Sequence, residues 1–305
     1  MRVLVNATSK EIDRLGGDFT LYRDWLRLTR SGLDFVSVPS HPIRHWNVNV
    51  RKGLERGCRT FQPRWLRRRL FLASRYLHVM AGPLKGVDLL FSHLLFPWTR
   101  SRPAVPIVWS SQGISPREYY ERYNRGQWNV EDVAFVYRTL GRRSSALVIP
   151  TEACAENVVR WCPELAGRVY VVPAPVFSDN RSPVAKPSKA DGVIRLLFVG
   201  VDAARKGLPE VVEAMGVLGR RYKHLRLDIV SRPTPQLRRR IEAVDGVRLY
   251  ISSPEVDVKA LMSQADVFVL PTHADTYALA AVEAMAHSCA VVISDLEPLP
   301  EIVPQ

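Results

Sequence analysis

Residues 266–286 decide the fold and read DVFVLPTHADTYALAAVEAMA. The first seven residues are a β-branched and aromatic run closed by a turn, which predicts a buried strand over 266–272. From Tyr277 onward apolar residues recur at spacings of three and four, which predicts a helix. Asp275 therefore lies at the mouth of that helix, and Glu283 lies about two turns further on.

The two carboxylates suit the recognition of sugar hydroxyls. Open α/β sheets bind ligands in the crevice beyond the carboxyl ends of their strands, and Asp275 and Glu283 can both face that crevice. Carboxylates accept hydrogen bonds from the neutral hydroxyls of a sugar or a ribose. The pattern predicts a sugar-nucleotide site. An alternative interpretation makes Asp275 a helix N-cap and Glu283 a solvated helix residue.

A regular alternation of strands and helices surrounds this stretch. The other strands expected after residue 190 are 194–200, 225–231, 247–252 and 290–295. The helices expected between them are 207–221, 234–244, 256–264 and 277–287. Such alternation predicts a parallel, doubly wound sheet.

The first half of the chain shows a similar α/β pattern. After an opening strand and a helical pattern over Phe19–Thr29, strands are expected at 34–38, 87–91, 106–110, 145–150 and 169–172. Residues 178–192 are polar and rich in Pro and Ser, which is typical of a linker. We therefore predict two Rossmann-like doubly wound domains facing a cleft. We expect residues 1–177 to form the first of these domains and residues 193–305 the second.

Residues 194–210, IRLLFVGVDAARKGLPE, place a glycine turn between a strand and a helix. The start of a helix presents unpaired backbone N–H groups and the positive end of the helix dipole, so it favours anions. Arg205 and Lys206 add two cations at this point. The segment therefore suits a phosphate group.

Three segments together resemble the motifs of retaining GT-B glycosyltransferases, the large group 1 or family 4 class. Residues 275–283 resemble the Glu-x7-Glu motif of that family, and residues 194–210 resemble its strand, glycine turn and Lys-Gly helix start. Residues 289–303, CAVVISDLEPLPEIV, resemble its next strand and Pro-Glu-Ile-Val turn. The order and spacing of the three segments make the resemblance specific.

The resemblance implies that residues 1–177 are the acceptor-side domain and residues 193–305 the nucleotide-sugar-binding domain, and it implies a role for each matched residue. Glu283 would hold the ribose, Asp275 the hydroxyls of the donor sugar, and Lys206 with Arg205 the diphosphate. The co-substrate is a nucleotide diphosphate sugar, with no further cofactor and no metal, because cations and a helix end supply the stabilising charge. The residues assigned to donor binding are Gly16, Gly17, Arg205, Lys206, Thr276, Tyr277 and Glu283.

The sequence also departs from the family pattern. Gln112 stands where many relatives carry a pocket histidine, and its amide can hydrogen-bond a sugar but cannot take a proton at neutral pH. Asp275 replaces the usual Glu, and Ala278 replaces a usual glycine. The chain stops at Gln305 where relatives continue, so we expect an incomplete second domain. The expected activity is that of a retaining, metal-independent hexosyltransferase, and a catalytically inactive nucleotide-sugar-binding protein of the same fold is the alternative.

Positive charge is concentrated in the first half. Residues 1–180 hold 27 Lys and Arg against 15 Asp and Glu, whereas residues 181–305 hold 16 against 15. In 61–77 arginines interleave with Trp, Leu and Phe at helical spacing, which predicts a helix that lies on an anionic membrane. A surface helix with its apolar face in the core is the alternative. The residues predicted to contact the membrane are Arg64, Trp65, Arg67, Arg68 and Arg69.

Composition and cysteine content narrow the class of protein. With 47% hydrophobic and 24% charged residues, the chain has ordinary globular usage. The four cysteines lack CxxC spacing, so neither a zinc site nor a disulfide framework is indicated. There is no signal-peptide pattern and no apolar run of about 18 residues, so we expect a cytoplasmic protein with peripheral contact to the inner membrane face. Its acceptor would be a glycan or lipid, and no nucleic-acid-reading module is recognisable.

Overall fold

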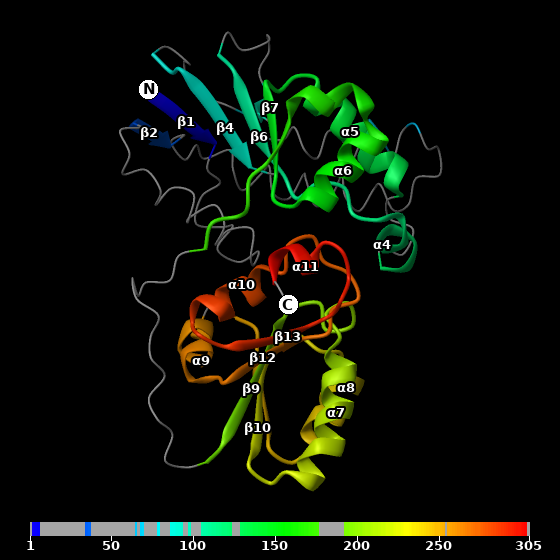
Figure 1. The fold of residues 1–305 in the computed structure, drawn as a ribbon, viewed down its shortest axis with the longest axis vertical. Coiled ribbons are helices and arrows are strands. Elements are labelled where there is room, and N and C mark those ends of the chain that lie inside the picture. The colour runs from blue at the N-terminus through cyan, green and yellow to red at the C-terminus, as the bar shows by residue number, and fades with distance from the viewer. Residues whose placement is uncertain are drawn as a thin grey trace. The chain divides into compact units, whose positions relative to one another are not determined.

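The structure is a computed structural model, and it describes residues 2–6, 34–37, 65, 68–69, 78–79, 86–93, 97–98, 105–123, 129–176, 192–253 and 255–303. The described residues divide into two units between Ala174 and Pro175 (Figure 1). Several predicted features lie outside the described residues, namely Gly16, Gly17, Arg64, Arg67, the helix over 19–29 and the linker up to residue 191.

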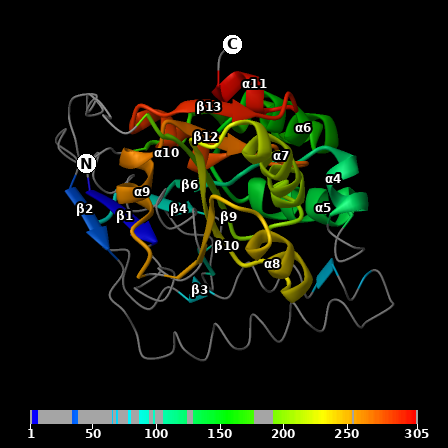
Figure 2. The same ribbon diagram turned by 90° about the horizontal axis from the view of Figure 1, so that it is seen from below.

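The second unit is built on a five-stranded sheet in the order β11-β10-β9-β12-β13, with every neighbouring pair parallel. Its strands are β9 (Ile194–Gly200), β10 (Leu225–Ser231), β11 (Val247–Ile251), β12 (Val267–Leu270) and β13 (Ala290–Ile293). Its helices are α7 (Leu208–Arg221), α8 (Pro235–Glu242), α9 (Val258–Gln264), α10 (Leu279–Ala286) and α11 (Leu299–Ile302). Figures 1 and 2 show α7 and α8 on one face of this sheet and α9 and α10 on the other, so the predicted doubly wound sheet is confirmed.

Apolar side chains from both faces of the sheet make the core of this unit. Leu197 and Phe198 of β9 are fully buried, as expected for a central strand covered on both sides. Helix α7 buries Leu208, Val211, Val212 and Met215, whose spacing puts them on one helical stripe.

The first unit holds a six-stranded sheet in the order β2-β1-β4-β6-β7-β8, which is also parallel throughout. Its strands are β1 (Arg2–Asn6), β2 (Asp34–Ser37), β4 (Leu89–His93), β6 (Ile107–Ser110), β7 (Ala146–Ile149) and β8 (Val169–Val171). The strands β3 (His78–Val79) and β5 (Pro97–Trp98) pair separately. The helical elements are α4 (Arg117–Arg122), α5 (Val130–Gly141), α6 (Glu152–Trp161) and the 3-10 helix η2 (Pro163–Arg168).

Helix α5 begins with a capping box that also anchors a distant arginine. The Asn129 side chain accepts a hydrogen bond from the backbone N–H of Asp132 at 2.9 Å. The fully buried Asp132 carboxylate accepts a bond from Arg68 Nε at 2.9 Å. Arg68 is thus tied to α5, a contact different from the lipid contact that the sequence predicted for it.

Candidate functional site

Two loops of the second unit meet at the carboxyl edge of its sheet. Residues 201–207 follow β9 and residues 271–278 follow β12, and these two strands are paired neighbours. Parallel neighbours end at the same edge, which is where open α/β sheets bind ligands. The loops carry most of the residues that the sequence assigned to the donor.

Lys206 and Asp275 form an ion pair between the two loops, from the Lys206 ammonium to Asp275 Oδ2. Their side chains are 16% and 12% exposed, so the pair is largely shielded from water. The other carboxylate oxygen, Asp275 Oδ1, accepts the backbone N–H of Thr276 at 2.9 Å. The structure therefore brings together a cation and a carboxylate that the sequence placed far apart in the chain.

Further hydrogen bonds join the two loops, and no sequence pattern predicted them. Arg205 Nη1 donates to the Ala274 carbonyl at 2.7 Å, and the Arg205 carbonyl accepts from the His273 N–H at 2.8 Å. The buried Thr272 hydroxyl also donates to the Arg205 carbonyl at 3.2 Å. Arg205 is therefore held at the site through its backbone and its side chain.

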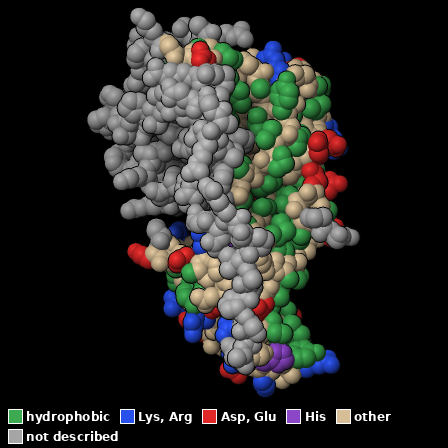
Figure 3. Space-filling view, turned by 60° about the vertical axis from the view of Figure 1, so that its left-hand side comes forward, with side chains coloured by type: hydrophobic (Ala, Val, Ile, Leu, Met, Phe, Trp, Pro, Cys, Tyr) green, Lys and Arg blue, Asp and Glu red, His purple; other side chains and the backbone are tan. Residues whose placement is uncertain are grey.

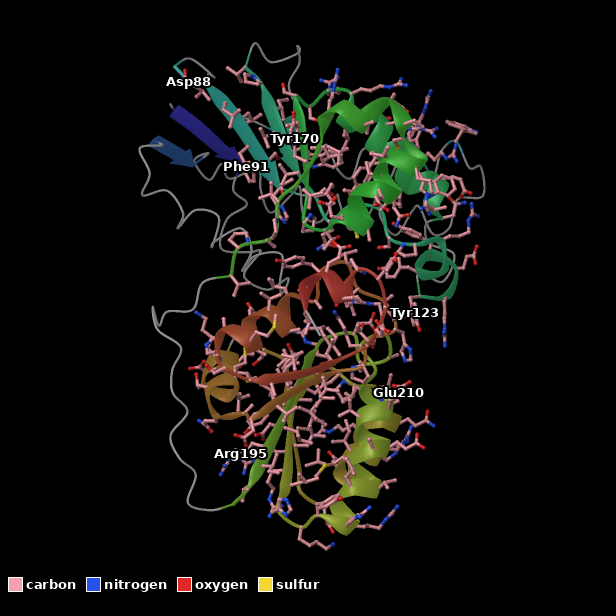
Figure 4. The ribbon with its side chains drawn as sticks, in the orientation of Figure 1. Asp88, Phe91, Tyr123, Tyr170, Arg195 and Glu210 are labelled. Carbon is pink, nitrogen blue, oxygen red and sulfur yellow. The ribbon has the colours of Figure 1, made fainter. Side chains whose placement is uncertain are left out.

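An additional contact links the start of α7 to the second loop. His273 Nε2 lies 2.8 Å from Glu210 Oε1. Figure 4 shows Glu210 near the end of α7 that carries the helix N-terminus. Sequence reasoning missed His273 and Glu210, because their meeting depends on the course of both loops.

Two glycines allow the close approach of the loops. Gly207 is the N-cap of α7 and has a left-handed backbone with φ of 77°, and a Cβ there would collide with the Pro271 carbonyl. At Gly200 a Cβ would lie 3.0 Å from Cβ and Cγ of Lys206. The glycines therefore set the position of Lys206 against the end of β12.

The buried pair has shifted protonation equilibria. Burial is the strongest influence on Lys206 and lowers its pKa, with Arg205 acting in the same direction and Asp275 against it. For Asp275 burial alone would raise the pKa, but Lys206, Arg205 and the Thr276 N–H together offset burial and hold the pKa below its ordinary value. Asp275 is therefore ionised at neutral pH and available as a hydrogen-bond acceptor.

Helix α10 starts later than predicted and is capped differently. Its N-cap is Ala278, in a left-handed conformation with φ of 45° and without a side-chain cap. The alternative in which Asp275 caps this helix is therefore wrong. Glu283 lies within α10 and is partly exposed, and its carbonyl accepts from the His287 ring at 2.8 Å.

In the first unit, Gln112 follows β6 and lies between two residues held by Tyr137. The Tyr137 hydroxyl lies 2.6 Å from the Ser111 hydroxyl and donates to the Gly113 carbonyl at 2.8 Å. On the neighbouring strand, His93 Nδ1 lies 3.0 Å from Ser110 Oγ. Burial lowers the pKa of His93 to about 4, so its ring is neutral at physiological pH.

His93 went unnoticed in the sequence because the strand was expected to end at residue 91, whereas β4 runs to His93. Its Nε2 atom is buried and has no hydrogen-bond partner among the described residues. The described residues also contain no cluster of three His, Cys, Asp or Glu side chains suited to a metal ion.

Comparison with known proteins relates the second unit to one protein family. Residues 194–305 match the family described as Glycosyl transferases group 1. No curated protein sequence matches the chain. The family match covers both loops and all of α10.

Solved structures with a similar fold include three proteins of low sequence identity. WaaG, a glycosyltransferase involved in lipopolysaccharide biosynthesis, has a TM-score of 0.56 and 16% identity over 96% of this chain and 80% of its own. An E. coli protein described as trehalose-6-phosphate and bound with UDP-2-fluoro glucose has a TM-score of 0.61 and 14% identity over 99% of this chain and 86% of its own. S. aureus TarM, solved with UDP, has a TM-score of 0.54 and 11% identity over 70% of this chain, which spans 42% of TarM. The shared fold is GT-B.

Proposed function

Residues 194–305 belong to the group 1 glycosyl transferases, and on that premise we propose that the protein transfers a sugar from a nucleotide diphosphate sugar to a glycan or lipid-linked acceptor. The observation that carries the proposal is the buried pair of Lys206 and Asp275, held between two loops at the ligand-binding edge of the sheet. In a nucleotide diphosphate sugar, one bond joins the sugar to the diphosphate. Asp275 can accept hydrogen bonds from the sugar, and Lys206 can pair with the diphosphate on the other side of that bond.

The roles of the two residues follow from their chemistry. The Asp275 carboxylate accepts hydrogen bonds from hydroxyls of the donor sugar. The Lys206 ammonium and the Arg205 guanidinium neutralise the diphosphate as the sugar leaves, and charge grows on its oxygens at that moment. The hydrogen bonds between the two loops support this arrangement of the two cations and the carboxylate.

The remaining donor contacts are proposed on the motif match. Glu283 holds the ribose, and Thr276 and Tyr277 line the donor beside Asp275. We also propose that the reaction retains the anomeric configuration. We propose that it needs no metal, because Lys206, Arg205 and the N-terminus of α7 would supply positive charge to the diphosphate. We propose separately that the Gln112 amide of the first unit hydrogen-bonds a sugar.

A second candidate is a catalytically inactive protein that binds nucleotide sugars. The observation that favours it is Gln112, which cannot exchange a proton where relatives carry a histidine. Such a protein would bind the donor through the same loops and release it unchanged.

Incubation with radiolabelled UDP-sugars and a mixture of oligosaccharide and lipid-linked acceptors separates the two candidates. We expect a labelled product, formed equally in the presence of a chelator, and lost in Asp275→Asn. Nuclear magnetic resonance of the product should show the donor's anomeric configuration. Donor binding without product would favour the inactive candidate, and inversion would contradict the retaining mechanism.

The proposed acceptor class includes lipids because of the basic segment of the first unit. Trp65 is 61% exposed, and the Arg69 guanidinium lies 5.6 Å from the centre of its ring. In the described part of the chain, no helix has the length and apolar character needed to cross a membrane. We propose surface contact through Trp65 and Arg69 on the cytoplasmic side, to be tested by the binding of Arg69→Gln to anionic vesicles.

A further inference from the structure

The apolar stripe of α7 continues past the core of the second unit. Leu208, Val211, Val212 and Met215 are buried against the sheet. The same helical spacing leads on to Leu218 and Tyr222, which are 39% and 37% exposed. Beside them Val217 is 57% exposed. These apolar side chains therefore face solvent at the end of α7.

Basic residues surround the exposed apolar side chains. Residues 214–227 contain Arg220, Arg221, Lys223 and Arg226 but no Asp or Glu, although residues 181–305 as a whole hold almost equal numbers of both signs. Among the described residues, no ion pair joins Arg220, Arg221 or Lys223 to an acidic side chain. Figure 3 shows basic, hydrophobic and histidine side chains gathered at the lower end of this unit.

Helix capping explains the charges but not the apolar side chains. Arginines in the last turn of a helix interact favourably with its dipole, and Arg220 and Arg221 have that position in α7. Helix α8 also ends in an arginine pair, Arg239 and Arg240, in its last turn. The exposed residues of α8 are polar apart from Pro235, and its apolar Leu237 and Ile241 are buried. Of these two helices, only α7 combines the arginine pair with exposed apolar side chains.

The aromatic contacts fit a boundary between water and lipid. The Arg221 guanidinium lies 5.3 Å from the centre of the Tyr222 ring, and the His224 ring lies 6.0 Å from it in an edge-on arrangement. Tyr and Arg combine an apolar body with a polar end, which suits the headgroup region of a bilayer. Anionic headgroups would pair with the arginines and the lysine at this end of α7.

We propose that the surface formed by Val217, Leu218, Arg220, Arg221, Tyr222 and Lys223 docks on an anionic membrane. It lies at the amino end of the strands, beside the start of β10, whereas Lys206 and Asp275 lie at the carboxyl end. Figure 4 shows the two ends, marked by Arg195 and Glu210. A seven-residue strand spans about 20 Å. Docking therefore keeps the donor loops clear of the bilayer.

Vesicle co-sedimentation of the full chain tests the proposal. Wild type should bind vesicles of equal parts phosphatidylcholine and phosphatidylglycerol at low salt, and not pure phosphatidylcholine. Arg220→Gln with Arg221→Gln should weaken this binding about 10- to 30-fold, because each arginine near the surface contributes about 1 kcal/mol. Leu218→Ser with Tyr222→Ser should also weaken it, although it leaves the charge unchanged.

The matched control is Arg239→Gln with Arg240→Gln, which removes the same charge from the last turn of α8. We expect less than about a threefold loss from this control, since its residues lack exposed apolar neighbours. Equal losses from both arginine pairs, or no loss from the Leu218 and Tyr222 changes, would overturn the proposal. So would a wild type that ignores anionic vesicles. Circular dichroism checks that each variant is folded, and product formation with a water-soluble acceptor tests the proposed function separately.

Discussion

Lys206 and Asp275 are 69 residues apart in the chain and form an ion pair that is largely shielded from water. The ion pair joins the loop after β9 to the loop after β12, and these two strands are neighbours in the sheet. It therefore contributes to the fold of the second unit as well as to the proposed donor site.

Lys206→Ala should destabilise the second unit as well as impair donor binding. The change leaves the Asp275 carboxylate shielded and unpaired, which costs about 3 kcal/mol in the free energy of unfolding. Denaturant unfolding of Lys206→Ala, Asp275→Ala and the double variant measures the coupling. We expect the double variant to lose less than the sum of the single losses, by about 1–3 kcal/mol. Strict additivity would show that the two side chains do not stabilise each other.

The same pair predicts a loss of stability in acid. Because the pKa of Asp275 is lower in the folded protein than in the unfolded chain, its contribution is present above the ordinary Asp value of about 4. That contribution is lost as the pH falls through the lowered folded value. Asp275→Asn should remove this part of the pH dependence, measured by unfolding at a series of acidic pH values. An unchanged acid slope in Asp275→Asn would contradict the assignment.

Gly207→Ala tests the close approach of the loops. A Cβ at Gly207 would meet the Pro271 carbonyl, and its backbone is left-handed, so we expect a loss of more than about 2 kcal/mol. Gly216→Ala is the matched control, because it lies within α7 with nothing within 4 Å of an added Cβ. It should gain about 0.5–1 kcal/mol from better helix propensity. Similar thermal stabilities for the two variants would refute this account of the site.

The buried His93 predicts a second loss of stability in acid, which begins at a higher pH than the loss caused by Asp275. Burial lowers its pKa from 6.5 to about 4, so the folded unit favours the neutral ring. Stability is therefore full above pH 6.5 and falls toward pH 4, by up to about 3 kcal/mol. In unfolding experiments at a series of pH values, His93→Gln should remove the loss of stability between pH 6.5 and pH 4. His224→Gln, at an exposed position, should leave that loss unchanged. If the same loss of stability persists in His93→Gln, another titrating group causes it.

The regular elements of the second unit could be predicted from sequence because their apolar periodicity is strong. The expected strands 194–200 and 225–231 match β9 and β10, and the expected helix 207–221 matches α7 to within one residue. Propensity alone placed the start of the helix after β12 two residues early, at Tyr277. It could not foresee that Ala278 adopts a left-handed conformation.

The candidate site could be predicted as a set of residues but not as a geometry. Asp275, Lys206 and Arg205 were identified from charge and spacing. Their contacts depend on backbone carbonyls at Ala274 and Arg205, and every residue has such a carbonyl, so no sequence pattern marks them. The position of His93 was missed for a related reason, because an apolar run does not fix the residue at which a strand ends.

The measurement that tests the central claim most directly is calorimetric titration of UDP into wild type and Glu283→Gln. Glu283 is partly exposed on α10, so the change should leave the fold intact by circular dichroism. We predict saturable binding to wild type and a dissociation constant about 10- to 100-fold higher in the variant, the loss expected for removing a charged hydrogen-bond partner. Binding of equal strength in both proteins, or no binding of UDP, GDP or ADP to wild type, would contradict the proposed nucleotide-sugar site.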